Sequence, residues 1–234
     1  MSLESSPDSS PPLPRVAIMM AMSADGKIAS HAREAAKFTS NADLVRLERV
    51  VSKHNALIMG SGTLKAYGTT FPVRDPVLLE ARRNAGLPPQ PITAIVTNTL
   101  DLPIGSPFFA YEDTPRLLIT TETAAQSRSG EFDGLAEIVV AGEKEVDPVA
   151  ALTHLSKRDA TRVLALGGGA FNFTLFDLDL VDDYYLTLVP TIIGGQTAPT
   201  PVDGRGLKID ERKSLTLVDW RQEAQEIFLH YQVL

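Results

Sequence analysis

The residues of this sequence that are best suited to chemistry form two glycine-rich junctions. In one of them, Gly167, Gly168 and Gly169 follow an apolar run, 162–166, and precede a helical segment from Ala170 to Phe176. Glycines let the chain turn sharply and present N–H groups without an obstructing Cβ. A helix N-terminus adds unpaired N–H groups and a favourable dipole, so the pattern favours a phosphate or pyrophosphate. A plain tight turn is the alternative that three glycines leave open.

The other junction has the same order of elements. Gly60, Ser61, Gly62 and Thr63 follow a short apolar run, 56–59, and open a further helical segment. Ligands of open α/β sheets lie at the carboxyl ends of the strands. Two strand-to-glycine junctions in one chain therefore indicate a nucleotide site.

Asp25 and Lys27 are the polar residues that follow the first apolar run, 15–22. They flank Gly26, and an Asp-Gly pair is also a common turn signal. Two interpretations stay open for them: ordinary turn chemistry, or a place in a reaction cleft.

The elements that must position these residues alternate between short apolar strands and helices. Such alternation predicts an α/β fold with a mostly parallel sheet covered on both faces. The chain ends differently, because two strand-like segments joined by a turn predict an antiparallel hairpin. The expected strands are 15–22, 56–59, 92–97, 117–120, 136–140, 162–166, 184–189, 213–220 and 226–233, and the main helices are 42–53, 77–84, 148–157 and 170–176.

The helix at 42–53 has a recognisable apolar pattern. Its spacing predicts one apolar face and places the charged residues elsewhere. Thr39, Ser40 or Asn41 can cap its N-terminus. The face is expected to contain Leu44, Leu47, Val50 and Val51, with Arg46, Glu48 and Arg49 away from it.

Composition limits the classes of function. The chain has 234 residues, a net charge of −7 and no cysteine. Its acidity gives no electrostatic reason to expect nucleic acid, and no apolar run approaches the ~20 residues of a membrane span. No signal peptide is visible, so the cytoplasm is the expected location. Residues 1–14 are rich in Ser and Pro and predict a disordered tail, followed by a single domain over 15–234.

No metal site is expected from the sequence. His31, His54, His154 and His230 match no metal-ligand spacing, and surface or packing roles are expected for them. A cluster of aspartates at 177, 179, 182 and 183 is interpreted as a solvated turn and a helix end.

Five segments in order resemble the pyrimidine reductase family of riboflavin biosynthesis, which has the dihydrofolate-reductase-like, three-layer fold. They are AMSADGKIA (21–29), ALIMGSGTL (56–64), the triple glycine with Phe171 and Asn172, LVDDYYLTLVPTIIGG (180–195) and APTPVDGRG (198–206). No deaminase-like zinc motif accompanies them. The chain therefore resembles the stand-alone reductase.

The resemblance implies an NADPH-dependent oxidoreductase, usually a homodimer whose C-terminal strands contribute to the interface. Family members reduce a ribosylamino-pyrimidine 5′-phosphate, either 5-amino-6-(5-phosphoribosylamino)uracil or its 2,5-diamino analogue, by hydride transfer to the sugar C1′. The cofactor carries the chemistry, and the protein supplies position and electrostatics. NADH is not excluded, because Thr97 and Asn98 offer no cation to a 2′-phosphate.

The same resemblance assigns roles to individual residues. Asp25 and Lys27 are implied to shape the reaction cleft as the catalytic pair, and Ser40, Arg46 and Asp203 are expected near the substrate. The residues expected to bind the cofactor are Gly60, Ser61, Gly62, Thr63, Thr97, Asn98, Gly142, Gly167, Gly168, Gly169, Ala170 and Phe171.

The departures from the family pattern concentrate on the substrate side. Ala36, Val51 and Leu166 stand where the family commonly has Ser, Arg and Glu, and 66–72 replaces an Asp-Asp-Pro motif. Loss of an Arg removes a charge-assisted contact worth about 1.5–3 kcal/mol, for which Arg46, Arg49 or Arg74 could compensate. Two alternatives follow: a reductase of the same fold with another substrate, such as a pterin, or a non-catalytic dinucleotide-binding module.

Overall fold

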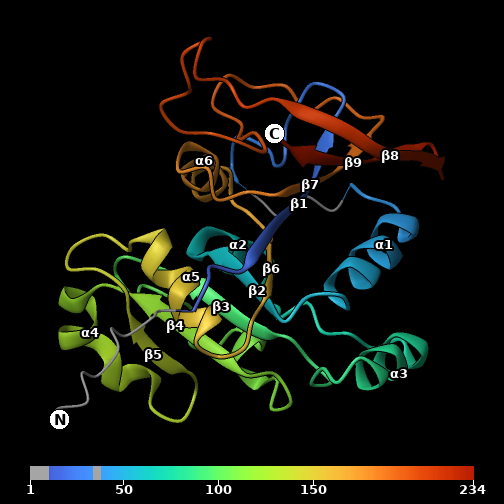
Figure 1. Ribbon diagram of the computed structural model, residues 1–234. Helices are drawn as coiled ribbons and strands as arrows, with labels where there is room; N and C mark the ends of the chain where they lie inside the picture. Colours follow the sequence, from blue (N-terminus) through green and yellow to red (C-terminus); the bar gives the residue numbers. More distant parts are fainter. Residues whose placement is uncertain (1–10, 34–37) are drawn as a thin grey trace, which may run out of the picture.

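The computed structural model describes residues 11–33 and 38–234, and its central feature is a nine-stranded sheet with the order β5-β4-β3-β2-β6-β1-β7-β9-β8 (Figure 1). The strands are β1 (Arg15–Ser23), β2 (Ala56–Gly60), β3 (Ile92–Val96), β4 (Arg116–Thr120), β5 (Glu137–Val140), β6 (Arg162–Ala165), β7 (Asp183–Val189), β8 (Leu215–Glu223) and β9 (Glu226–Val233). The helices are α1 (Asn41–Val51), α2 (Ser61–Tyr67), α3 (Pro76–Asn84), α4 (Glu122–Arg128), α5 (Pro148–Ser156) and α6 (Gly169–Asp177), with short 3-10 helices η1 (Pro107–Ala110) and η2 (Ser129–Phe132).

The topology confirms the predicted mostly parallel sheet with antiparallel strands at its C-terminal end. Every pairing from β5 to β7 is parallel, whereas β9 pairs antiparallel with both β7 and β8. The observed strands and helices agree with the expected ranges within about two or three residues, which is normal for element ends. Both 3-10 helices were missed, because single turns of this kind have no periodic pattern.

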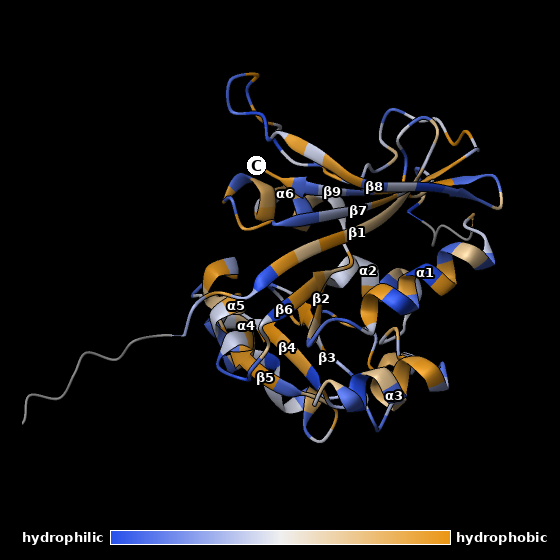
Figure 2. Ribbon diagram, turned by 45° about the vertical axis from the view of Figure 1, so that its right-hand side comes forward, coloured by the Kyte–Doolittle hydropathy of each residue, from blue (hydrophilic) through white to orange (hydrophobic). Residues whose placement is uncertain are grey.

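Two apolar cores, one on each face of the sheet, produce the expected three layers. Side chains of a strand alternate between the faces. Thus Val16 and Ile18 of β1 pack in the core covered by α5 and α6, while Ala17 and Met19 pack in the core beneath α1, α2 and α4. Figure 2 shows the result as largely hydrophobic central strands between the helical layers.

The predicted apolar face of α1 is wrong in two positions. Leu44 has 54% of its surface exposed, whereas Arg46 is only 8% exposed. The reason is that the sheet offers Arg46 a complete set of partners: its guanidinium donates to the carbonyl oxygens of Leu186 and Leu229 and to Thr187 Oγ1. It also lies over the Phe228 ring, 4.9 Å from the centroid, and such a cation–π contact helps to offset the burial of the charge.

The chain ends can be described only in part. Residues 1–10 of the predicted tail lie outside the described residues. Near its end, the Pro12 carbonyl accepts a hydrogen bond from Ser156 Oγ of α5, and Pro14 is buried. None of the helices in the described ranges has the length and apolar character needed to cross a lipid bilayer.

Candidate active site

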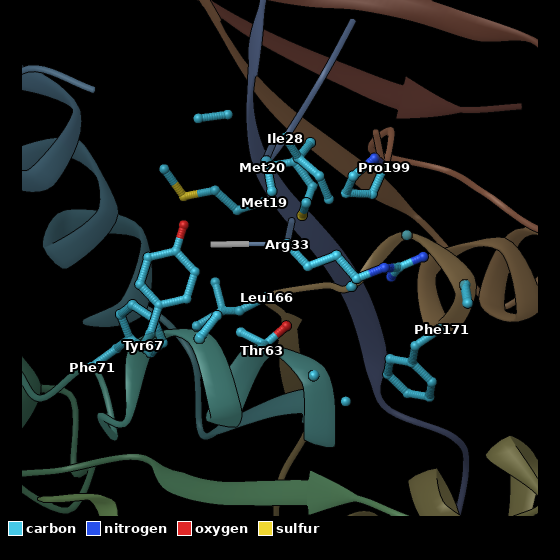
Figure 3. Close-up of a pocket in the computed structure, with 18 of the residues that line it drawn as sticks. Met19, Met20, Ile28, Arg33, Thr63, Tyr67, Phe71, Leu166, Phe171 and Pro199 are labelled. Carbon is cyan, nitrogen blue, oxygen red and sulfur yellow. The ribbon is translucent and has the colours of Figure 1, made fainter. Parts of the chain in front are cut away.

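A single large cleft brings most of the predicted site residues together. It has a volume of about 1170 Å³ and is open to the surface. Its floor is formed by the carboxyl ends of β1, β2, β3 and β6, and α1 with the 66–74 segment forms one wall. Figure 3 shows Tyr67 and Phe71 on this wall and Phe171 on the opposite side, with Thr63 and Arg33 between them.

The two glycine junctions meet at the centre of the cleft. Because β2 and β6 are neighbours, the Gly60 N–H donates to the Gly167 carbonyl oxygen over 2.9 Å. The Leu166 N–H donates to the Ile58 carbonyl oxygen over 3.0 Å, and a cis peptide bond joins Gly167 to Gly168. The junctions therefore form one continuous backbone surface.

The helix α6, which begins at this surface, has no side-chain cap at its N-terminus. Gly168 is the N-cap of α6 and makes no side-chain cap hydrogen bond, and Gly60 is the equally uncapped N-cap of α2. The other α-helices of the described chain are capped by Ser40, Asp75, Thr121 and Asp147. The first-turn N–H groups of α6 therefore remain available to an anion in the cleft.

The three glycines of this loop have different reasons for lacking a side chain. A Cβ on Gly169 would lie 2.3 Å from the Thr200 carbonyl oxygen, and one on Gly167 would lie 2.9 Å from Met20 Sδ. A Cβ on Gly168 would meet nothing within 4 Å, and its φ of −71° suits any residue. Backbone packing excludes a side chain at Gly169 and the φ of +83° disfavours one at Gly167, whereas Gly168 borders open space in the cleft.

The predicted adenosine end lies one strand further along the sheet. Thr97 and Asn98 follow β3 and line the cleft. Gly142 does not line it: this glycine has φ +145°, and a Cβ there would lie 2.0 Å from the Glu145 carbonyl oxygen. Its loop still reaches the site, because Asn98 Oδ1 accepts the Val146 N–H over 3.0 Å. Gly142 thus shapes a loop that is bonded to Asn98, and it does not itself line the cleft.

Asp25 has a structural environment that does not match the predicted catalytic role. Its carboxylate accepts hydrogen bonds from Ser23 Oγ at 2.6 Å, Ile193 N at 3.1 Å and Gly194 N at 2.7 Å. The Ser23 hydroxyl, with these amides, lowers the Asp25 pKa to about 2. Asp25 does not line the cleft. Its carboxylate instead joins the turn after β1 to the 192–195 loop.

Three cationic side chains among the described residues line the cleft. Lys27 keeps its predicted place, with Nζ donating to the Ala198 carbonyl oxygen over 3.1 Å. Arg74 lies on the 66–74 wall and donates to the Tyr111 hydroxyl over 3.3 Å. Arg33 was missed from the sequence, and its guanidinium has no hydrogen bond or ion pair within the described ranges. Figure 3 shows its side chain extended across the cleft.

Ser40 and Arg46 lie behind the wall that α1 forms. Ser40 caps α1, and its N–H and hydroxyl both donate to the Glu226 carboxylate, each at 2.6 Å. The guanidinium of Arg46 donates its hydrogen bonds to β7 and β9. Neither Ser40 nor Arg46 lines the cleft. Their predicted substrate contacts are therefore replaced by roles in attaching α1 to the sheet.

Asp203 lines the cleft next to the glycine loop. Its carboxylate accepts from Thr200 N and Thr200 Oγ1, and its N–H donates to the Gly169 carbonyl oxygen over 3.1 Å. The residue therefore supports the glycine loop. Its neighbour Arg205 pairs with Asp177, one of the aspartates of the predicted acidic cluster.

The positions that depart from the family pattern can be placed individually. Val51 and Leu166 are buried, and both contribute to the cleft wall together with most of the 66–72 segment. Ala36 lies outside the described residues. An Arg at position 51 would bury its charge in an apolar core, so Arg74 and Arg33 are better placed to meet an anionic substrate.

Asp43 is the other cleft residue that the sequence did not reveal. It lies in the first turn of α1, is 6% exposed and accepts a hydrogen bond from Thr187 Oγ1 at 2.6 Å. Burial raises its pKa above the ordinary value. An aspartate at this helix position is common near N-termini, so the sequence carried no signal that it would be buried beside a cavity.

The chain was compared with known protein families and structures. The RibD C-terminal domain family matches residues 14–229. A 2,5-diamino-6-ribosylamino-4(3H)-pyrimidinone 5′-phosphate reductase from Archaeoglobus fulgidus is 28% identical over 191 residues, 82% of this chain and 87% of its own length. The reductase of the same name from Methanothermobacter thermautotrophicus is 29% identical over 213 residues, with coverages of 87% and 94%.

A solved structure agrees with the fold. A pyrimidine reductase-like protein from Corynebacterium diphtheriae superposes with a TM-score of 0.80 at 20% identity, covering 94% of this chain and 92% of its own. The agreement covers nearly all of both chains and therefore supports the dihydrofolate-reductase-like architecture.

Proposed function

This chain belongs to the RibD C-terminal domain family, and from that membership we propose that it is an NADPH-dependent reductase of riboflavin biosynthesis. Its proposed substrate is 2,5-diamino-6-ribosylamino-4(3H)-pyrimidinone 5′-phosphate, the compound named for the archaeal relatives. The observation that carries the proposal is the uncapped glycine surface at the centre of a cleft large enough for a cofactor and a substrate. Ligand sites typically measure about 300–1,000 Å³.

The residues around this surface fit a dinucleotide. A Cβ on Gly62 or Gly168 would enter open space in the cleft, so a pyrophosphate can approach the backbone at both positions. The N-terminus of α6 offers free N–H groups to it, and Thr97 and Asn98 would flank the adenosine. The cofactor supplies a hydride when bound. The protein's residues hold it over the carboxyl ends of β2 and β6 and exclude water.

The substrate phosphate needs a cation, and Arg74 is the one we assign to it. Arg74 lies on the 66–74 wall, and its guanidinium donates only to the Tyr111 hydroxyl among the residues the structure describes. A guanidinium can bind two phosphate oxygens at once. Lys27 and Arg33 also line the cleft and would meet the reacting sugar and the cofactor.

A second candidate is a reductase that acts on another ring, such as a pterin. The observation that favours it is the apolar character of the wall, where Leu44, Leu47, Tyr67, Phe71 and Pro72 line the cleft. Such a surface would accept a larger flat ring without a phosphate. A non-catalytic dinucleotide-binding module would use the same glycine surface and is tested by the same assay.

We also propose that the protein is a homodimer that associates through β8. All nine residues of β8 are exposed, and they include Leu217, Val218 and Trp220 with 49%, 53% and 61% of their surfaces free. An exposed edge strand with apolar side chains tends to pair with another chain. Light scattering of the parent and of Trp220→Glu tests this, because a parent that is monomeric at micromolar concentration would contradict it.

Substrate-dependent oxidation of the cofactor tests the proposed function. The purified protein would be supplied with NADPH or NADH and, in turn, with the diaminopyrimidinone phosphate, its deaminated uracil analogue and dihydropterin or pterin. We expect turnover with a ribosylamino-pyrimidine phosphate and preference for NADPH. Turnover with the pterin alone would favour the second candidate, and cofactor binding without any turnover would favour the non-catalytic module.

A further inference from the structure

Asp43 is a buried acid that lines the cleft and has no part in the proposed binding of the cofactor or of the substrate phosphate. Only 6% of its surface is exposed, yet it lines the cavity from the first turn of α1. Burial of a carboxyl group is unfavourable unless the group is paired, and buried acids with shifted pKa values concentrate at functional sites. The residue therefore requires an explanation beyond helix capping, which Ser40 already provides.

The hydrogen bonds around Asp43 have a fixed direction. Arg46 Nη1 can only donate, and it donates to Thr187 Oγ1 over 2.8 Å. The single Thr187 hydroxyl proton is then directed to Asp43 Oδ1, 2.6 Å away. Oδ1 is thereby held as an acceptor, so a proton bound by the carboxyl group resides on Oδ2. The hydroxyl of Thr39, which also lines the cleft, favours the charged form of this carboxyl group.

The order of the strands places Asp43 at the reacting end of a bound cofactor. The residues assigned to the adenosine follow β3, and those assigned to the pyrophosphate follow β2 and β6. The next strand is β1, so an extended dinucleotide spans about 14 Å across these strands and ends over β1. Thr187 of β7 is the register partner of Ala21 on β1, and Ala21 lines the cleft. Asp43 thus lies above the β1–β7 pair, beyond the pyrophosphate.

We propose that Asp43 is the general acid that supplies the proton accompanying hydride transfer. This inference rests on the proposed function. Hydride addition forms a C–H bond at the imine-like C1′ and oxidises the nicotinamide, while the π electron pair of the C=N bond moves to nitrogen. That nitrogen takes the proton from Asp43 Oδ2, so an O–H bond breaks and an N–H bond forms. The carboxylate then recovers a proton from solvent. Thr187 and Arg46 are positioning residues.

The electrostatic surroundings of Asp43 suit a proton donor. Burial is the main cause of its raised pKa, and the negative charge of Glu226 at the start of β9 acts in the same direction. The positive charge of Arg46 and the hydroxyls of Thr187 and Thr39 oppose the shift. A raised pKa keeps a larger fraction of the acid protonated near neutral pH, where a general acid must hold its proton.

The test is the pH dependence of turnover in Asp43→Asn, with Asp133→Asn as the control because Asp133 is exposed and lies outside the cleft. The parent should lose kcat as pH rises through the Asp43 pKa. The variant should have kcat lowered on the order of 100-fold, a flat profile in that range and an unchanged Kd for NADPH. An Asp43→Asn variant with the parental kcat and pH profile would overturn the role of Asp43. The proposed function would still stand in that case, because the parent would still turn over the substrate.

Thr187→Val provides a second test that does not remove the acid. The Thr187 hydroxyl stabilises the charged form of Asp43, so its removal should raise the Asp43 pKa further and move the alkaline limb of kcat to higher pH. Asp43→Glu should restore part of the kcat lost in the Asn variant. If the alkaline limb of Thr187→Val coincides with that of the parent, the limb belongs to another group and the proposal fails.

Discussion

The proposed cofactor half and the proposed substrate half of the cleft are built from different parts of the chain. The cofactor half consists of backbone: glycine junctions after β2 and β6 and the uncapped N-terminus of α6. The proposed substrate half consists of side chains from α1 and the 66–74 segment, including Arg74 of that segment and Asp43 in the first turn of α1. A backbone surface tolerates few substitutions, because a Cβ on Gly169 would clash with the Thr200 carbonyl oxygen and Gly167 has a φ of +83°. A side-chain surface can change its residues without disturbing the sheet.

This difference explains where the chain departs from its family. The glycine motifs are intact, whereas the substitutions at 51, 66–72 and 166 all contribute to the substrate side or to its boundary with the glycine loop. The two halves should therefore respond independently to mutation.

The largest effect is expected from Gly168→Val. The valine side chain would occupy the open space in which the pyrophosphate is expected, without backbone strain because φ is −71°. The Kd for NADPH should rise about 100-fold, near 2.7 kcal/mol, in a direct binding titration. Gly130→Val is the matched control, since a Cβ there also meets nothing within 4 Å and the residue lies outside the cleft. An unchanged Kd would show that the pyrophosphate lies elsewhere.

A smaller effect, confined to the substrate half, is expected from Arg74→Gln. Loss of one exposed charge-assisted contact to phosphate should raise KM for the ribosylamino-pyrimidine phosphate about tenfold, near 1.4 kcal/mol. The Kd for NADPH should not change. Arg49→Gln is the control, because Arg49 is exposed on α1 and does not line the cleft. If both arginine variants keep the parental KM, Arg74 does not bind the phosphate.

The smallest effect on activity is expected from Asp25→Asn, which alters neither half directly. The folded parent protein binds fewer protons at Asp25 than the unfolded protein does, because hydrogen bonds in the folded state lower the Asp25 pKa to about 2. Its contribution to stability is present above the unfolded pKa of about 3.8 and is lost as pH falls toward 2. Urea unfolding across this range should show less acid dependence in the variant than in the parent. At neutral pH kcat should be unchanged; a loss on the order of 100-fold would restore Asp25 to the catalytic group.

The sequence predicted the backbone features of this molecule better than its side-chain contacts. The alternation of strands and helices gave the sheet, and the glycine junctions gave the centre of the cleft, because both depend on local patterns. The capping roles of Asp147 and Ser40 were likewise readable, since a cap bonds to its own helix.

The errors arose where a residue's role depends on distant partners. Arg46 is buried because carbonyl groups of β7 and β9, about 140 to 180 residues away, accept its hydrogen bonds. Asp25 meets the 193–194 amides and Asp43 meets Thr187, and neither contact leaves a local pattern. Arg33 was missed because it stands in an irregular segment, in a left-handed conformation with φ +58° that its sequence context does not indicate.

The central claim is that the cleft holds NADPH so that its hydride reaches the sugar C1′ of a ribosylamino-pyrimidine phosphate. It is tested most directly with NADPH carrying deuterium at the transferable C4 position and mass analysis of the purified product. The account predicts one deuterium in the ribitylamino product, located at C1′, for each NADPH oxidised. Oxidation of NADPH without deuterium in a pyrimidine product, or no oxidation by a protein that binds both ligands, would contradict it.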